Sequence, residues 1–255
     1  MTRVIVSRDK LTAVADAIRM KGQTTEALTL DEMPQAIDGI KTGGDAESFL
    51  IGVAERTLTE CSSDKITSVG DYAFNKMNKI TEVNLPNVES IGQAAFQACT
   101  GIQVFDFPKC KTIGVQSFAS CNGGLSFSMP LLEKVSQGSL NSMTRLVSVN
   151  LPLVKTIDTQ GFYFCSSLPK ADFLQLESIG QHGFNQTKMA TLIIRTNAVC
   201  TLAHTNAFLN SPVVRGEGYI YVPKSLVDSY KTATNWSTYS DQIRAIEDYP
   251  EITGG

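Results

Sequence analysis

The residues of this 255-residue chain that could form a nucleophile or a metal site are six cysteines and two histidines. Structural zinc sites use paired Cys or His ligands at short spacing, such as CxxC, and the sequence has no such pair. His182 and His204 have no carboxylate or thiol at a spacing typical of catalysis. The GxxxxGK[ST], GxSxG and HExxH motifs are also absent. The sequence therefore predicts a protein that is not an enzyme and uses no metal or cofactor.

Several of these cysteines belong to a sequence repeat, and the repeat predicts the secondary structure around them. The segment IGQAAFQACTGIQVFDFPKCKT (residues 91–112) is followed at once by IGVQSFASCNGGLSFSMPLLEK, so the period is 22 residues (113 − 91). The leading position holds Val69, Ile91, Ile113, Val135, Ile157 and Ile179, and five residues later stand Phe74, Phe96, Phe118, Leu140, Phe162 and Phe184. A period of this length is typical of a solenoid.

Each repeat combines two patterns of hydrophobic periodicity, one typical of a strand and one typical of a helical turn. Ile80–Pro86 ends in strict alternation of apolar and polar residues, which predicts a short strand that the proline stops. Gly70–Met77 has apolar residues three apart, which suits one helical turn. One such unit cannot bury its own apolar edge, whereas stacked coils share a continuous core. We therefore predict an α/β repeat, a solenoid of 22-residue units that each contain a short strand and a helical turn.

The cysteines fall mainly in core columns of this repeat. Cys99, Cys121 and Cys165 share a column with Met77 and Met143, and Cys110 shares one with valine and leucine. We therefore expect buried thiols that act as small apolar side chains. A Cys99–Cys121 disulfide is the alternative, because adjacent coils would bring equivalent Cα atoms near the disulfide range.

The motif I-G-x-x-A-F-x-x-C-x-x-I-x-x-V-x-L-P, matched from residue 69 to about 195, resembles the BspA-type leucine-rich repeat. This resemblance implies a leucine-rich-repeat solenoid. Such repeats occur in bacterial surface proteins and in prophage-encoded structural proteins, so the resemblance implies that this chain belongs to one of these two classes.

Residues 1–45 lack the repeat and carry their own helix signals. Ser7 can cap a helix over residues 8–21, and Thr29 with Glu32 forms a capping box for a second helix. Two short helices bury little surface alone, so we expect them to dock on a partner. Residues 11–40 resemble the N-terminal segment of tail and minor structural proteins of phages of gut Firmicutes. That resemblance implies attachment to other phage structural proteins or to sister subunits.

The expected organisation has four parts. Residues 1–45 form the two-helix module and linker, 46–66 an N-terminal half coil, 67–198 the leucine-rich repeats, and 199–255 an irregular last repeat with a C-terminal cap. The cap is expected because a solenoid needs atypical ends to cover its last coil. Its signals are a strand over 218–222, a helix that begins near Lys224, and the aromatic segment from Trp236 to Tyr239.

One surface could carry function. The outward strand positions form a polar stripe when coils stack, which we interpret either as a solvated sheet face or as a shallow binding surface for a glycan or protein. The aromatics near the C-terminus could likewise pack in the cap or stack on sugars. The candidate binding residues are Glu82, Asn84, Asp106, Ser128, Asn150, Lys170, Asp172, Tyr219, Tyr221 and Trp236.

The composition argues against two classes of partner, nucleic acids and membranes. A net charge of −3 gives no basis for binding nucleic acid, which needs clustered Lys and Arg. No apolar run approaches the roughly 18 residues of a membrane-spanning helix, so we expect no membrane insertion. The main hypothesis is a phage or prophage structural protein, made in the bacterial cytoplasm and located in the virion, that recognises a host surface protein or glycan or decorates the particle. The alternative is a BspA-like adhesin, secreted or on the bacterial surface.

Overall fold

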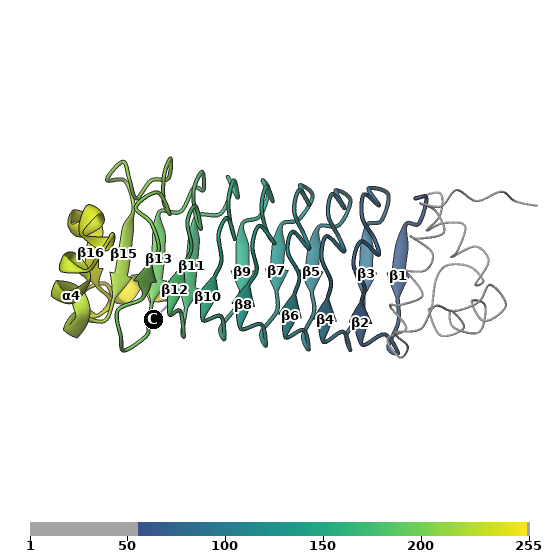
Figure 1. Cartoon of the computed structure of the whole chain (residues 1–255), viewed down its shortest axis with the longest axis horizontal. Helices are drawn as coiled ribbons and strands as arrows, with labels where there is room; N and C mark the ends of the chain where they lie inside the picture. Colours follow the sequence, from purple (N-terminus) through teal and green to yellow (C-terminus); the bar gives the residue numbers. More distant parts are fainter. Residues whose placement is uncertain (1–55, 254–255) are drawn as a thin grey trace, which may run out of the picture.

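The computed structural model describes residues 56–253, and the described chain winds into a rod of about eight turns (Figure 1). Each turn adds short strands to the stack, and a small helical cap closes the C-terminal end. This arrangement confirms the predicted leucine-rich-repeat solenoid. The expected two-helix module at 1–45, and residues 46–55 of the expected half coil, lie outside the described residues.

Two rows of parallel strands run along the rod. The first row consists of three sheets with the orders β1-β3, β5-β7-β9 and β11-β13-β15-β16, and the second row of two sheets, β2-β4-β6 and β8-β10-β12-β14. The first row holds β1 (Glu60–Ser62), β3 (Glu82–Asn84), β5 (Val104–Asp106), β7 (Ser126–Ser128), β9 (Ser148–Asn150), β11 (Lys170–Phe173), β13 (Thr191–Ile194), β15 (Tyr219–Val222) and β16 (Ile243–Ala245). The second row holds β2 (Ser68–Val69), β4 (Ser90–Ile91), β6 (Thr112–Ile113), β8 (Lys134–Val135), β10 (Thr156–Ile157), β12 (Ser178–Ile179) and β14 (Thr201–Leu202).

In each coil the segment that is predicted to form a helical turn, such as residues 70–77, is built from non-helical turns instead. Alternate amides donate to the next coil: Tyr72 N to Gln93 O (2.8 Å), Phe74 N to Ala95 O (2.7 Å) and Lys76 N to Gln97 O (2.7 Å). The amides between them donate three residues back, as Asn75 N does to Tyr72 O (3.0 Å). Tyr72 and Lys76 have φ of 59°, in the left-handed region. Hydrogen bonds between coils therefore take the place of half of the bonds that a helix would form, and they join successive turn segments from residue 72 to residue 209.

At Gly114 and Gly180, the glycine after the leading apolar residue allows close approach between coils. A Cβ on Gly114 would lie 2.4 Å from Gln93 N, and one on Gly180 would lie 2.5 Å from Thr159 N. Backbone atoms of the preceding coil thus occupy the space that a side chain would need. Ser136 stands in the same column, and its hydroxyl donates to Ile113 O (2.6 Å).

The core contains stacked phenylalanines along the rod axis, in two ladders rather than the single ladder through Phe96, Phe118 and Phe162 that the repeat predicts, because Leu140 interrupts the column. Phe118 stacks on Phe96 with ring centroids 5.4 Å apart and an interplanar angle of 6°, and Phe96 stacks on Phe74 at 4.9 Å. A second ladder joins Phe162 to the next coils, with the 162–184 centroids 5.2 Å apart. These side chains are fully buried. Burying aromatic rings in register on every coil supplies much of the apolar contact that stabilises a solenoid.

The cysteines confirm the core interpretation. All six are free and buried, so the Cys99–Cys121 disulfide is not formed. Three thiols donate to a carbonyl of the preceding coil: Cys99 Sγ to Phe74 O (2.9 Å), Cys121 Sγ to Phe96 O (2.9 Å) and Cys165 Sγ to Leu140 O (3.1 Å). Burial raises the thiol pKa to about 12 for Cys61, Cys99, Cys110, Cys165 and Cys200, and raises that of Cys121 well above its ordinary value.

The native thiols are therefore expected to stay unreactive toward an aromatic disulfide reagent at pH 8, and all six are expected to react in denaturant. The thiolate is the reacting species, and an unfolded cysteine has a pKa of about 8.5. Since folding raises the pKa, the cysteine contribution to stability is complete below about pH 8.5 and is lost as pH rises toward about 12. Absorbance of the released thiolate measures reactivity, and denaturant melts measure stability. Rapid labelling of native protein would contradict this core placement.

The C-terminal cap covers the last coil, as expected. It contains η1 (Lys224–Leu226), α4 (Val227–Thr232) and η2 (Trp236–Gln242), and η3 (Ile246–Asp248) and η4 (Pro250–Thr253) follow β16. Its side chains satisfy backbone groups beside β14, which is the edge of its sheet. Trp236 Nε1 donates to Cys200 O (2.5 Å), the Cys200 amide donates to the Tyr230 hydroxyl (2.9 Å), and Asn235 Nδ2 donates to Leu202 O (2.7 Å). An uncovered parallel edge would invite pairing with another chain.

Candidate binding surface

The outward side chains of β3, β5, β7 and β9 form one surface, here called the strand face. Its members are Glu82, Asn84, Val104, Asp106, Ser126, Ser128, Ser148 and Asn150. Their order follows from the register, since Val104 pairs with Ser126 and Ser126 with Ser148, while Asp106 pairs with Ser128 and Ser128 with Asn150. Paired strands lie about 4.8 Å apart, so two columns of short side chains repeat at that interval.

Most of the strand face is exposed. Glu82, Asn84, Asp106 and Asn150 are exposed, and Val104 keeps 58% of its surface in solvent. Asn150 Nδ2 donates to Ser128 Oγ (3.3 Å) across neighbouring coils. The structure thus brings together five of the residues predicted for this surface, which are Glu82, Asn84, Asp106, Ser128 and Asn150. The face offers carboxylate, amide and hydroxyl groups around one apolar side chain.

A shallow hollow lies at the boundary between two sheets of the first row. β3 belongs to the sheet with β1, and β5 begins the next sheet. The hollow is lined by Thr81, Glu82, Val83, Gly101, Gln103, Val104 and Asp106. A Cβ on Gly101 would lie 2.4 Å from Ile80 O, so this corner of the lining has no room for a side chain. The hollow combines two carboxylates with an amide and an exposed valine.

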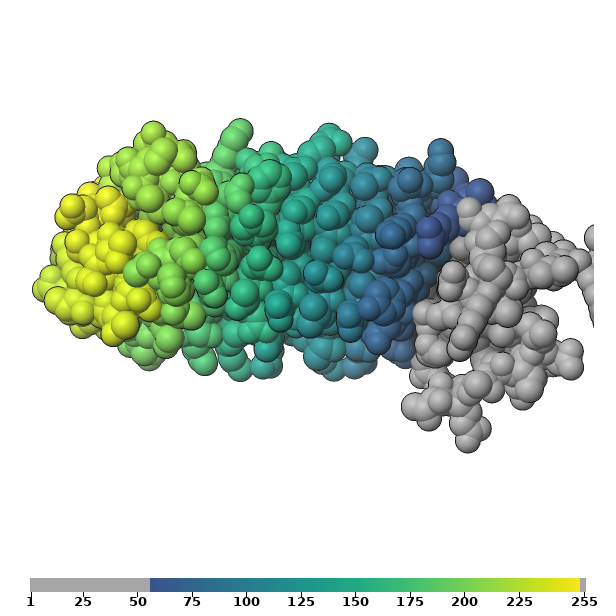
Figure 2. Space-filling view, turned by 45° about the horizontal axis from the view of Figure 1, so that its top comes forward, coloured from purple at the N-terminus to yellow at the C-terminus, as the bar shows by residue number. Residues whose placement is uncertain are grey.

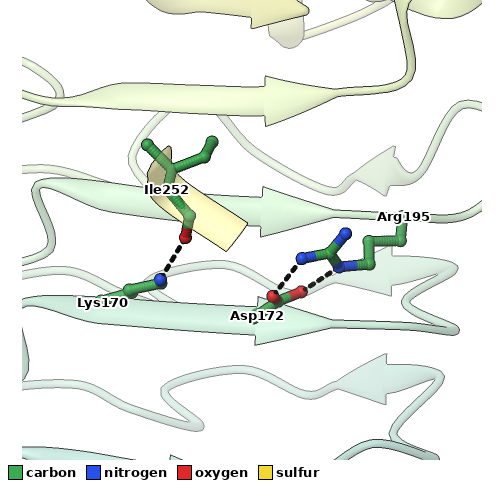
Figure 3. Close-up of polar contacts among 4 residues, drawn as sticks. All are labelled: Lys170, Asp172, Arg195 and Ile252. Atoms are coloured by element: carbon green, nitrogen blue, oxygen red, sulfur yellow. Dashed lines mark hydrogen bonds and ion pairs between the residues drawn. The ribbon is translucent and has the colours of Figure 1, made fainter. Parts of the chain in front are cut away.

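Lys170 and Asp172, the predicted members of the stripe on β11, already have partners (Figure 3). Asp172 accepts two hydrogen bonds from Arg195, from Nε (2.8 Å) and Nη2 (2.7 Å). This pair raises the pKa of the Arg195 guanidinium. Lys170 Nζ donates to the backbone carbonyl of Ile252, which comes from the C-terminal segment. Both side chains are therefore engaged by other parts of this chain and are not counted in the open strand face.

The predicted aromatic residues pack in the C-terminal part of the molecule. Trp236 is 1% exposed and contacts Tyr230 with ring centroids 5.1 Å apart. Tyr221 is buried, and its ring meets that of Tyr249 at 5.4 Å. Tyr219 is half-buried beneath the Arg244 guanidinium, whose carbon lies 4.6 Å from the ring centroid. For Trp236 the structure places the side chain in the cap core, which is the packing alternative of the sequence analysis.

The course of the C-terminal segment is the feature that sequence reasoning missed. Residues after β16 turn back over the first row of strands and contact Lys170, which precedes them by 82 residues. The segment lies outside the repeat register, so no column of the repeat indicates its position. Its acidic and aromatic composition, Glu247 to Glu251, was the only available signal.

In the described part of the chain, the remaining chemistry-bearing residues form no site of the kind that metals use. Within residues 56–253, no group of three or more His, Cys, Asp or Glu could hold a metal ion. The ring nitrogens of His182 lie 2.6 Å from Asn185 Nδ2 and 3.2 Å from Asn206 Nδ2, so this histidine joins neighbouring coils. The described part of the chain also contains no helix that is both long and apolar enough to cross a membrane.

Comparison with solved structures finds leucine-rich-repeat proteins from bacteria. A leucine-rich repeat protein from Bacteroides ovatus ATCC 8483 is 16% identical over 66% of this chain and 56% of its own length, with a TM-score of 0.48. The T. pallidum leucine-rich repeat protein is 22% identical over 51% of this chain and 57% of its own, with a TM-score of 0.40. A leucine rich cell surface protein from Faecalibacterium prausnitzii A2-165 is 17% identical over 65% and 60%, with a TM-score of 0.41. This chain thus spans between half and two thirds of each of these structures. No curated protein sequence matches it significantly.

The repeat itself identifies the family. Six copies of the BspA type leucine-rich repeat region match residues 56–169 and 105–215, which together span 160 of 255 residues (215 − 56 + 1). The matched range covers the phenylalanine ladder, the thiol column and the strand face. The chain therefore belongs to the BspA-type leucine-rich-repeat family.

Proposed function

We propose that this chain is a non-catalytic binding module of a bacterial surface protein, and that its strand face recognises a protein on a host cell. The observation that carries the proposal is the openness of this face. The outward positions of β3 to β9 are largely exposed, whereas Ile193 of β13 and Tyr221 of β15 are buried, and the Tyr249 ring of the C-terminal segment contacts Tyr221. The BspA-type family adds support, since bacterial surface proteins are one of its settings.

The chemistry of the strand face favours a protein ligand over a glycan. Val104 is exposed at its centre, with Glu82, Asp106 and Ser126 around it, which resembles the apolar centre and polar rim of a protein interface. The aromatic side chains of the predicted set lie elsewhere, in or beside the cap. Hydrogen bonds between all coils hold the face rigid, which lowers the ordering cost of binding.

The strand face is expected to lose binding when a large charged side chain is placed in it. Val104→Arg should weaken binding of fluorescently labelled protein to cultured epithelial cells by about 10-fold or more, because it fills the apolar centre. Thr112→Arg is the matched control, since it adds the same exposed side chain on β6 in the second row. Flow cytometry over a concentration series gives the affinities.

Treating the cells with trypsin should abolish the signal, and loss only after glycosidase treatment would identify a glycan ligand instead. Equal binding of both variants and the wild type would overturn the assignment to the strand face. Absence of saturable binding would overturn the host-cell role.

A phage particle is the second candidate, favoured by the resemblance of residues 11–40 to N-terminal segments of phage tail proteins. In that case residues 1–45 attach the chain to structural proteins of the particle or to sister subunits. Prophage induction followed by density-gradient centrifugation separates the two candidates. Co-sedimentation with particles supports the virion, and recovery with the bacterial envelope or medium supports the surface protein.

A further inference from the structure

The last eight described residues, Ile246–Thr253, form a segment here called the C-terminal strap. After β16 the chain reverses along the rod, and its end lies beside β11 to β13 rather than beyond the cap (Figure 1). The Tyr249 ring meets Tyr221 of β15, and the Ile252 carbonyl accepts a hydrogen bond from Lys170 of β11 (Figure 3). Between these two contacts the strap must cross β13.

Burial on β13 agrees with this path. Ile193 pairs with Asp172 of β11 and with Tyr221 of β15, so it belongs to the outward row of side chains. It is nevertheless 0% exposed, whereas the outward Val104 of β5 is 58% exposed. The strap thus covers an apolar patch of the same row of strands that is open further along the rod. In the space-filling view the described coils form one continuous rod, with the C-terminal cap at one end (Figure 2).

The strap is held largely by contacts that are exposed and polar. Lys224 donates its backbone amide to Glu247 Oε2 (2.8 Å) and its ammonium to Asp248 Oδ1 (2.8 Å). The side chains of Lys224 and Asp248 are 66% and 51% exposed, so salt screens this pair. The hydrogen bond to Asp248 raises the pKa of Lys224. Within the strap, single turns form from Tyr249 N to Ile246 O and from Ile252 N to Tyr249 O.

We propose that the outward face of β11, β13 and β15 is a peptide-binding site, which the strap occupies and from which an acidic, aromatic-containing segment of another protein can displace it. The strap defines the ligand chemistry. Lys224 selects carboxylates, Tyr221 makes an edge-to-face contact with an aromatic ring, Ile193 is covered by the peptide, and Lys170 binds a main-chain carbonyl. This site is separate from the strand face and does not rest on the function proposed for it.

Displacement has a definite structural consequence. It exposes Ile193 and Tyr221, and it extends the open row of outward side chains from β9 to β15. Because the strap is tethered, its effective concentration at the site is of the order of millimolar. A free peptide therefore binds the intact chain weakly, and weakening the strap raises its apparent affinity.

The test uses the full chain and a fluorescein-labelled peptide with the sequence of residues 246–253. Asp248→Asn combined with Tyr249→Ala weakens the strap and leaves the face intact. Fluorescence anisotropy should show binding about 10-fold or more tighter to this variant than to the wild type. Adding Lys224→Ala to the variant should remove the gain, and Lys79→Ala, an exposed lysine on the turn side, should not. A scrambled peptide controls for charge alone.

Equal affinity of the peptide for the variant and the wild type, or no binding to either, would overturn the proposal. Hydrogen exchange on the wild type gives an independent reading if the variant unfolds. The amides of Tyr249 and Ile252 should exchange about 10-fold or more faster than those of β13 and β15, since the strap opens by itself. Exchange of the strap only together with global unfolding would make it part of the cooperative core and refute displacement.

Discussion

Replacing Phe118 with alanine is expected to lower the free energy of unfolding by about 3–5 kcal/mol, because the side chain leaves a cavity in the middle of the rod. Phe118 is fully buried and contacts four rings, with centroid distances from 5.0 Å to Phe127 to 6.0 Å to Phe107. Each coil supports only its neighbours, so a cavity here weakens the interfaces on both sides. Equilibrium denaturation in urea, followed by circular dichroism, measures the loss.

Two controls separate the cavity from the loss of an aromatic ring. Phe118→Leu places there the residue that fills the same column one coil later, at Leu140, and should cost about 1–2 kcal/mol. Phe164→Ala removes a phenylalanine that is 39% exposed and should cost about 0.5 kcal/mol or less. A Phe118→Ala loss below about 1 kcal/mol would contradict the central position of this ladder.

Replacing Trp236 with alanine is expected to cost about 3–5 kcal/mol as well, with the damage concentrated in the C-terminal coils. Trp236 packs on Tyr230 and Phe208, and its indole is the donor to Cys200 O. Removal leaves a buried carbonyl without that donor and opens the apolar end of the phenylalanine ladder. Hydrogen exchange should rise first in β14 and β15, while β5 to β9 keep their protection.

Trp236→Phe isolates the hydrogen bond from the packing. It keeps most of the apolar contact, loses the indole N–H, and should cost about 1–3 kcal/mol. Leu209→Ala, at an exposed position near the cap, should change stability by about 0.5 kcal/mol or less. Loss of protection spread evenly along the rod after Trp236→Ala would show that the cap and the repeats unfold as one unit.

The candidate surface was only partly predictable, because it depends both on which side chains point outward and on whether another part of the chain covers them. The alternation of residues such as Glu82 and Asn84 around Val83 indicates which side chains point outward, and the repeat indicates that they align. Whether an outward side chain is open depends on what lies over it. Lys170 and Tyr221 satisfy the same pattern, yet the strap contacts both.

By itself the sequence determined the period, the core columns and the parallel register. Stacking brings each residue beside its counterpart 22 positions along, as with Thr156 and Ser178, so one repeated column becomes one continuous row in space. Phe118 and Cys121 could be placed in the core for that reason. Only the tertiary structure decided the backbone of the turns, because hydrogen bonds such as Tyr72 N to Gln93 O join two coils and outweigh the preference for a helix. It also decided the path of the strap, because the strap lies outside the repeat and its contact with Lys170 joins residues 82 positions apart, which no local pattern encodes.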